Sequence, residues 1–135
     1  MRGSGLIAGA AVVLCLATGC ASPRPAPAPV TADMVLGHWT GDCGADLDLA
    51  EDGTFRFKNF ESDARGQGPE RPRLTGEGHW YLETGVGDIP PSLDLKFQKE
   101  IYSLEYQRAE DGSLKALRYL ADVDEEVDCV YRKQG

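Results

Sequence analysis

The sequence predicts an all-β domain, a small up-and-down antiparallel barrel of about eight strands, with a two-sheet sandwich as the alternative. Apolar and polar residues alternate with a period of two over most of the chain after residue 33. Turn sequences rich in Gly, Asp and Pro separate these segments at short intervals. The barrel is favoured because closure of a sheet leaves no exposed strand edge.

The expected elements follow one another along the chain. A short helical turn is expected at Thr31 to Val35, with Thr31 as its N-cap, and no other segment has a clear helical period. The strands are expected at Leu36 to Thr40, Ala45 to Ala50, Thr54 to Phe60, Leu74 to Glu83, Ser92 to Gln98, Tyr102 to Gln107, Leu114 to Ala121 and Val127 to Arg132.

Four turn sequences connect these strands: "GDCGA" from Gly41, "EDGT" from Glu51, "GVGDIPP" from Gly85 and "EDGS" from Glu110. Asp-Gly pairs are typical of hairpin turns, which need a residue with positive φ. The tetrapeptide "AEDG" occurs twice, but its flanking residues differ. We therefore interpret the two copies as shared turn chemistry and not as an internal repeat.

The strand from Leu74 to Glu83 has two glycines at positions that face inward. Its expected inward residues are Leu74, Gly76, Gly78, Trp80 and Leu82. Glycine inside a strand allows strong bending or the close approach of another group. We expect Trp80 or another aromatic ring to fill this space in preference to a ligand cavity.

The first nineteen residues have the layout of a secretory signal peptide, with Arg2, an apolar run from Leu6 to Ala17, and small residues at the exit. The run is shorter than the roughly 20 residues that a membrane span needs. The next stretch reads Ala17, Thr18, Gly19, Cys20, which resembles the lipobox of bacterial lipoproteins.

The lipoprotein resemblance implies cleavage before Cys20, attachment of diacylglycerol to its thiol, and an amino terminus open to acylation, for example by palmitate. It places the protein at the extracytoplasmic face of the cell membrane. Cys15 is expected to leave with the signal peptide, because Leu14 before it is too bulky for cleavage there. The alternative is an ordinary signal peptide that is cut after Ala21 or later.

Prolines alternate with small residues from Ala21 to Asp33, which favours an extended tether of about 3.1 Å per residue. The sequence therefore divides into a signal peptide at 1–19, a lipidated cysteine with its tether at 20–33, and a barrel domain at 34–135.

Cys43 and Cys129 remain once Cys15 is removed and Cys20 carries lipid. In an exported protein they are expected to form a disulfide, and in a closed barrel the first turn and the last strand are neighbours. A metal site made by Cys43, Cys129, His38 and His79 is the alternative. It is disfavoured because the spacing matches no compact ligand motif.

The run "LGHWTG" contains Gly37 and Trp39 and resembles the first-strand signature of lipocalins and other calycins. That resemblance implies a lipocalin-like barrel with a late-strand arginine over the tryptophan, and Arg132 has the matching place. More widely, "GHWTGDCGADLDLAEDGTF", "GEGHWYLETG" and the closing "VYR" resemble small actinobacterial lipoproteins. Those lipoproteins have no characterised function that could be transferred.

The sequence contains no serine elbow, phosphate-binding glycine loop or His-Glu-x-x-His motif. His38 and His79 are expected to be exposed, and the acidic cluster at 121–128 lacks the ligand order of an EF-hand, so an acidic loop is favoured over a calcium site. The net charge of −8 disfavours nucleic acid as a partner. No catalytic residue, cofactor or metal ligand is assigned.

We expect a non-enzymatic, monomeric, membrane-anchored binding module of the cell envelope, whose partner is an unidentified small ligand or envelope protein. The alternative is an inhibitor of a secreted cationic hydrolase such as a lysozyme. Small barrel lipoproteins that block cationic lysozymes are similar in their anchor, disulfide and acidity. An enzyme is the third possibility.

Overall fold

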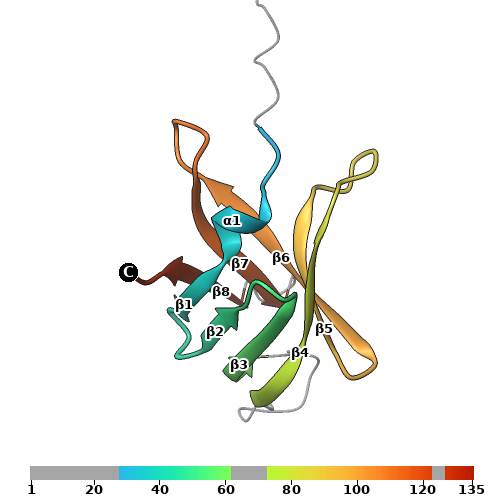
Figure 1. Cartoon of the computed structure of the whole chain (residues 1–135), viewed down its shortest axis with the longest axis vertical. Helices are drawn as coiled ribbons and strands as arrows, with labels where there is room; N and C mark the ends of the chain where they lie inside the picture. The colour runs from blue at the N-terminus through green and yellow to red at the C-terminus, as the bar shows by residue number, and fades with distance from the viewer. Residues whose placement is uncertain (1–27, 62–72, 123–126) are drawn as a thin grey trace, which may run out of the picture.

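The computed structural model describes residues 28–61, 73–122 and 127–135. They form a closed barrel in which eight antiparallel strands follow one another in sequence order (Figure 1). The all-β fold class and the barrel are confirmed, and the sandwich alternative is wrong. A short helix, α1 (Ala32–Val35), precedes the first strand.

All eight expected strands are confirmed, and their ends differ from the expected ends by no more than two residues. The strands are β1 (Gly37–Gly41), β2 (Asp46–Leu49), β3 (Thr54–Glu61), β4 (Arg73–Glu83), β5 (Ser92–Phe97), β6 (Glu100–Arg108), β7 (Leu114–Asp122) and β8 (Val127–Lys133). Thr31 occupies the N-cap position of α1, but its side chain makes no capping hydrogen bond.

The barrel closes where β1 pairs with β8, with Thr40 opposite Arg132. The backbone N–H of Asp42 donates to the carbonyl of Val130 at 3.0 Å. In return, the Val130 N–H donates to the Asp42 carboxylate at 3.0 Å. These two bonds extend the pairing beyond the end of β1, so the seam is held at the turn as well as in the strands.

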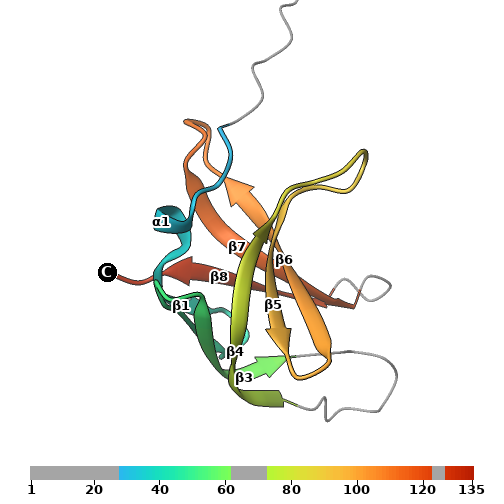
Figure 2. The ribbon, with the colours of Figure 1, turned by 45° about the vertical axis from the view of Figure 1, so that its right-hand side comes forward.

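The two ends of the barrel differ in what they carry. At the end that we call the upper end, α1 and the loop between β4 and β5 project, together with the β6–β7 turn, and the chain enters there (Figures 1 and 2). The β1–β2 and β5–β6 turns lie at the opposite, lower end. The entering chain therefore lies beside the base of the β4–β5 loop.

Aromatic rings fill the barrel at the two inward glycines of β4. A Cβ atom on Gly76 would lie 2.5 Å from the ring of Phe97. One on Gly78 would meet the Lys96 carbonyl and would lie 2.7 Å from the ring of Phe55. The ring of Phe57 lies between them, with its centroid 5.1 Å from that of Phe55 and 4.9 Å from that of Phe97. The expectation that aromatic rings fill this space is confirmed, although the rings belong to Phe55 and Phe97 and not to Trp80.

The two "AEDG" sequences form turns with the same hydrogen bonds. Ala50 N–H donates to the Thr54 carbonyl at 2.9 Å, and Ala109 N–H donates to the Ser113 carbonyl at 2.9 Å. The glycines that follow each Asp have φ of 85° and 86°, which the three-residue hairpin loop requires. The interpretation of these copies as shared turn chemistry is confirmed.

Candidate functional site

A hollow of about 580 Å³ lies at the upper end of the barrel, and we call it the mouth pocket. Its volume falls within the range of roughly 300–1,000 Å³ that is usual for small-molecule sites. Most of the surface that lines it is apolar. The lining residues are Pro29, Val30, Leu82, Glu83, Thr84, Gly85, Pro90, Pro91, Glu105, Tyr106 and Arg108.

The pocket exists because β5 is shorter than its neighbour β6. The last pair between them joins Ser92 to Glu105, whereas β6 continues to Arg108. The residues before Ser92 are Pro90 and Pro91, which have no N–H with which to extend the ladder. The barrel wall is therefore open beside the last residues of β6.

The chain that enters the barrel forms a further wall of the mouth pocket. Pro29 and Val30 line it, and Val30 also packs against the hydrophobic core. Part of the expected tether at 20–33 is therefore in contact with the barrel. The span that separates Cys20 from the first described residue, Ala28, is correspondingly short.

Tyr106 supplies a polar group to this apolar site. Its hydroxyl is buried and has no hydrogen-bond partner among the described residues. Burial raises the pKa of Tyr106 to about 12, and the negative charge of Asp94 contributes to the increase. The hydroxyl is thus protonated at neutral pH, and no described residue uses it as a hydrogen-bond donor.

Arg108 is held at the edge of the mouth pocket, since its Nη1 donates to the Gly112 carbonyl at 2.9 Å. The acidic side chains of Glu83 and Glu105 also line the pocket. An apolar space with a few polar groups is suited to binding. The described lining residues include no Ser, Cys, Lys or His.

A second hollow, of about 550 Å³, lies on the outer face of the barrel and is much more polar. Arg56 and Glu77 line it and form an ion pair with 2.7 Å between Nη2 and Oε1, although both side chains are largely exposed. His79 also lines this hollow and is exposed, as expected. Solvated cross-strand charge pairs are an ordinary feature of an outer barrel face.

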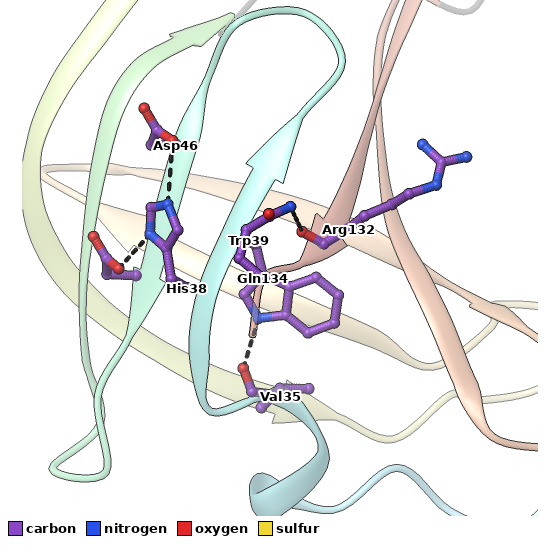
Figure 3. A network of polar contacts seen from close by, with 7 residues as sticks. Val35, His38, Trp39, Asp46, Arg132 and Gln134 are labelled. Atoms are coloured by element: carbon purple, nitrogen blue, oxygen red, sulfur yellow. Dashed lines mark hydrogen bonds and ion pairs between the residues drawn. The ribbon is translucent and has the colours of Figure 1, made fainter.

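His38 lies on the outer face of β1 between two carboxylates of β2 (Figure 3). Its Nδ1 is 2.6 Å from Asp48 Oδ1, and its Nε2 is 3.3 Å from Asp46 Oδ1. The side chain is 44% exposed, which confirms the expectation that it faces solvent. Cross-strand contacts with the two carboxylates account for its position.

Trp39 is buried at the start of the barrel, and its indole N–H donates to the Val35 carbonyl at 2.8 Å (Figure 3). The cation over its ring is Lys133, whose Nζ lies 5.9 Å from the ring centroid. A Cβ atom on Gly37, which has φ of 121°, would lie 3.1 Å from the Lys133 side chain. Gly37 therefore makes room for this lysine.

The position of Arg132 differs from the expected one over the tryptophan. Its side chain is exposed and directed away from Trp39 (Figure 3). Successive residues of a strand face opposite sides of the sheet. Because the neighbouring Tyr131 is buried in the core, Arg132 faces outward and Lys133 is the residue that approaches the ring.

The disulfide between Cys43 and Cys129 is confirmed, with the two Cα atoms 5.4 Å apart. It joins the β1–β2 turn to β8 across the seam of the barrel. Both sulfur atoms are bonded to one another, so neither is available as the thiolate ligand that the alternative metal site requires. A Cβ atom on Gly41 would lie 2.6 Å from Cys129 Sγ, so only glycine leaves space for the bond.

Several expectations lie outside the described residues. These are the signal peptide at 1–19, Cys20 with most of its tether, and the central part of the acidic cluster at 123–126. In the part of the chain that the structure describes, no helix is both long and apolar enough to cross a membrane.

The fold and the site define a small closed barrel of eight antiparallel strands with a packed interior, which is compatible with a lipocalin-like fold. No protein-family model matches the chain. Searches of the curated proteins and of the solved structures also give no match.

The residues of the mouth pocket are not predicted as a site by the sequence. "GVGDIPP" predicts a turn and Leu82 an inward strand position, but no motif marks Tyr106. The signal that could have found the site is the pair Pro90 and Pro91, which stops β5 early. The contribution of Val30 has no local sequence signal, because it depends on how the entering chain packs.

Proposed function

We propose that the protein is a non-enzymatic binding module of the cell envelope, anchored at the extracytoplasmic face of the membrane by lipid on Cys20. Its ligand is a small, predominantly apolar molecule that binds in the mouth pocket. The observation that carries this proposal is the apolar hollow of about 580 Å³ beside the entry of the chain.

Two features of the barrel support the mouth pocket as the binding site. Aromatic rings occupy the interior where β4 has its glycines, so a ligand does not fit there without repacking the core. The Tyr106 hydroxyl is buried and has no partner among the described residues, and a hydrogen bond to such a group is favourable. A carbonyl, carboxylate or ether oxygen on the ligand would accept this bond.

The anchoring part of the proposal is supported by the sequence around Cys20 and by the disulfide. A bonded Cys43–Cys129 pair fits an oxidising compartment. Removal of the first nineteen residues would leave Cys20 with seven residues between it and Ala28, the first described residue.

Native mass spectrometry of the protein purified from its own host tests both parts of the proposal. We expect an amino terminus at Cys20 with added acyl mass, and a retained small molecule. An unmodified amino terminus beyond residue 20 would contradict the anchoring. A fully acylated protein that retains no ligand and binds no apolar probe would contradict the binding function alone.

A matched pair of tyrosine variants tests the site itself. We expect Tyr106→Phe to weaken binding of the retained molecule by about 2- to 13-fold, since a single neutral hydrogen bond contributes about 0.5–1.5 kcal/mol. Tyr81→Phe, in β4, is the control, because Tyr81 does not line the pocket. If titration calorimetry gives Tyr106→Phe and Tyr81→Phe the same affinity for the retained molecule, the Tyr106 hydroxyl does not bind it.

The second candidate function, inhibition of a secreted cationic hydrolase, is favoured by the net charge of −8. Acidic proteins associate with basic partners faster at low ionic strength. A test is salt-dependent binding and inhibition of a lysozyme by the acylated protein. Inhibition that Tyr106→Phe does not change would support this function over ligand binding in the mouth pocket.

A further inference from the structure

The tip of the loop between β4 and β5 carries two exposed aliphatic side chains. Val86 is 74% exposed and Ile89 is 70% exposed, the highest values among the large hydrophobic residues that the structure describes. We call the segment from Val86 to Ile89 the hairpin tip. It projects from the upper end of the barrel in both views (Figures 1 and 2).

The hairpin tip is an ordered structure. Val86 and Ile89 form a β-bridge, and the Ile89 N–H donates to the Val86 carbonyl at 3.0 Å. Gly87 has φ of 59°, which suits a tight turn. A Cβ atom on Gly85 would lie 2.8 Å from the nitrogen of Pro91, so the two sides of the loop pack closely. Binding through this tip would therefore require little additional ordering.

The entering chain limits how far this end of the barrel can lie from the membrane. Cys20 and Ala28 are eight positions apart, which corresponds to at most about 29 Å in a fully extended chain. The chain reaches the barrel at the end from which the hairpin tip projects (Figures 1 and 2). If Cys20 carries lipid, as proposed above, the upper end is held near the bilayer.

We propose that the hairpin tip enters the headgroup region of the bilayer and forms a second, non-covalent contact with the membrane. Val86 and Ile89 bury their aliphatic side chains there. A weak contact is sufficient, because the short tether gives the tip a high effective concentration at the surface.

The charge of Asp88, between the two aliphatic residues, specifies the kind of surface. An anionic surface repels a carboxylate, whereas a zwitterionic headgroup offers an ammonium group. The contact is therefore stronger with zwitterionic than with anionic lipid. It also brings the mouth pocket, whose wall includes Gly85, Pro90 and Pro91, to the bilayer surface.

Tryptophan fluorescence of the full acylated chain in phosphatidylcholine vesicles tests the contact. Ile89→Trp places a probe at the tip, and Ile101→Trp is the matched control. Ile101 is also an exposed isoleucine, at 52%, but it follows the β5–β6 turn at the lower end. We expect lipid brominated near the headgroup to quench most of the added emission of Ile89→Trp and little of that of Ile101→Trp.

Flotation of the wild-type protein with the vesicles separates the contact from the anchor. If the protein floats but the two variants are quenched equally, the tip contact is wrong and the anchoring stands. If the protein does not float, both proposals are wrong. Val86→Trp provides a second probe of the tip should Ile89→Trp fail to fold, and it must show the same quenching.

Discussion

Asp52 and Asp111 show how a single residue type sets a turn in this protein. The Asp52 carboxylate accepts hydrogen bonds from the N–H and the hydroxyl of Thr54, at 3.0 and 2.5 Å. Asp111 accepts the equivalent bonds from Ser113, at 2.9 and 2.6 Å. These bonds favour the charged carboxylate, so they lower the pKa of both aspartates.

The lowered pKa values predict a contribution to acid unfolding. In the unfolded chain the pKa of Asp is about 3.9, so the stabilisation is present above that pH and is lost as the pH falls through the lower folded pKa. We expect Asp52→Asn with Asp111→Asn to make the free energy of unfolding less dependent on pH below about 4. Urea unfolding at several pH values across this range measures the slope of the free energy of unfolding against pH, which we call the acid slope.

Glu51→Gln is the control for the acid prediction, because Glu51 lies in the same turn but outside these hydrogen bonds. It should leave more of the acid slope in place than the double variant does. An acid slope that is the same in the wild type and the double variant would show that the two turns do not contribute.

At the scale of elements, β8 decides which cation covers Trp39. The strand alternates between the core and solvent, so the buried Tyr131 is followed by the exposed Arg132 and then by Lys133 beside the ring. A shift of one residue in strand register exchanges the two faces. The sequence "VYRK" contains two adjacent cations and does not by itself distinguish them.

This alternation predicts different effects for the two cations. We expect Lys133→Ala to lower the free energy of unfolding by about 1 kcal/mol, through loss of the contact with Trp39. Arg132→Ala should change it by less than about 0.5 kcal/mol, as is usual for an exposed side chain. Chemical unfolding followed by tryptophan fluorescence compares them, and a larger effect of Arg132→Ala would contradict the assignment.

At the scale of the whole molecule, the disulfide between Cys43 and Cys129 joins the first and last parts of the barrel. The two cysteines are 86 positions apart, so the bond closes almost the whole domain into a loop. Loss of chain entropy in the unfolded state is the main way in which such a bond stabilises a fold. When the bond is reduced, the β1–β8 pairing and the hydrogen bonds between Asp42 and Val130 have to close the barrel.

We expect reduction of the disulfide to lower the free energy of unfolding by about 4 kcal/mol. Urea unfolding of the wild-type protein with and without a reductant measures this loss. The reduced wild type is the appropriate comparison, because Cys129 is buried and its replacement would also remove packing. Equal midpoints in the two conditions would show that the hydrogen bonds of the seam close the barrel without the disulfide.

The elements of the barrel could be predicted because their signals are local. The alternation in "TFRFKNF" and the Asp-Gly pair just before it act within a few residues of the chain. The disulfide was also predictable, since only Cys43 and Cys129 remain in the domain. The mouth pocket was not, because it depends on where β5 stops relative to β6 and on the packing of Val30.

The sequence by itself determined the strands, their turns and the pairing of the two cysteines, because periodicity, turn chemistry and cysteine number do not depend on long-range geometry. The tertiary structure decided which rings fill the space beside Gly76 and Gly78, and which cation lies over Trp39. It also decided where the wall of the barrel opens. These features depend on register and closure, which bring together residues that are distant in sequence.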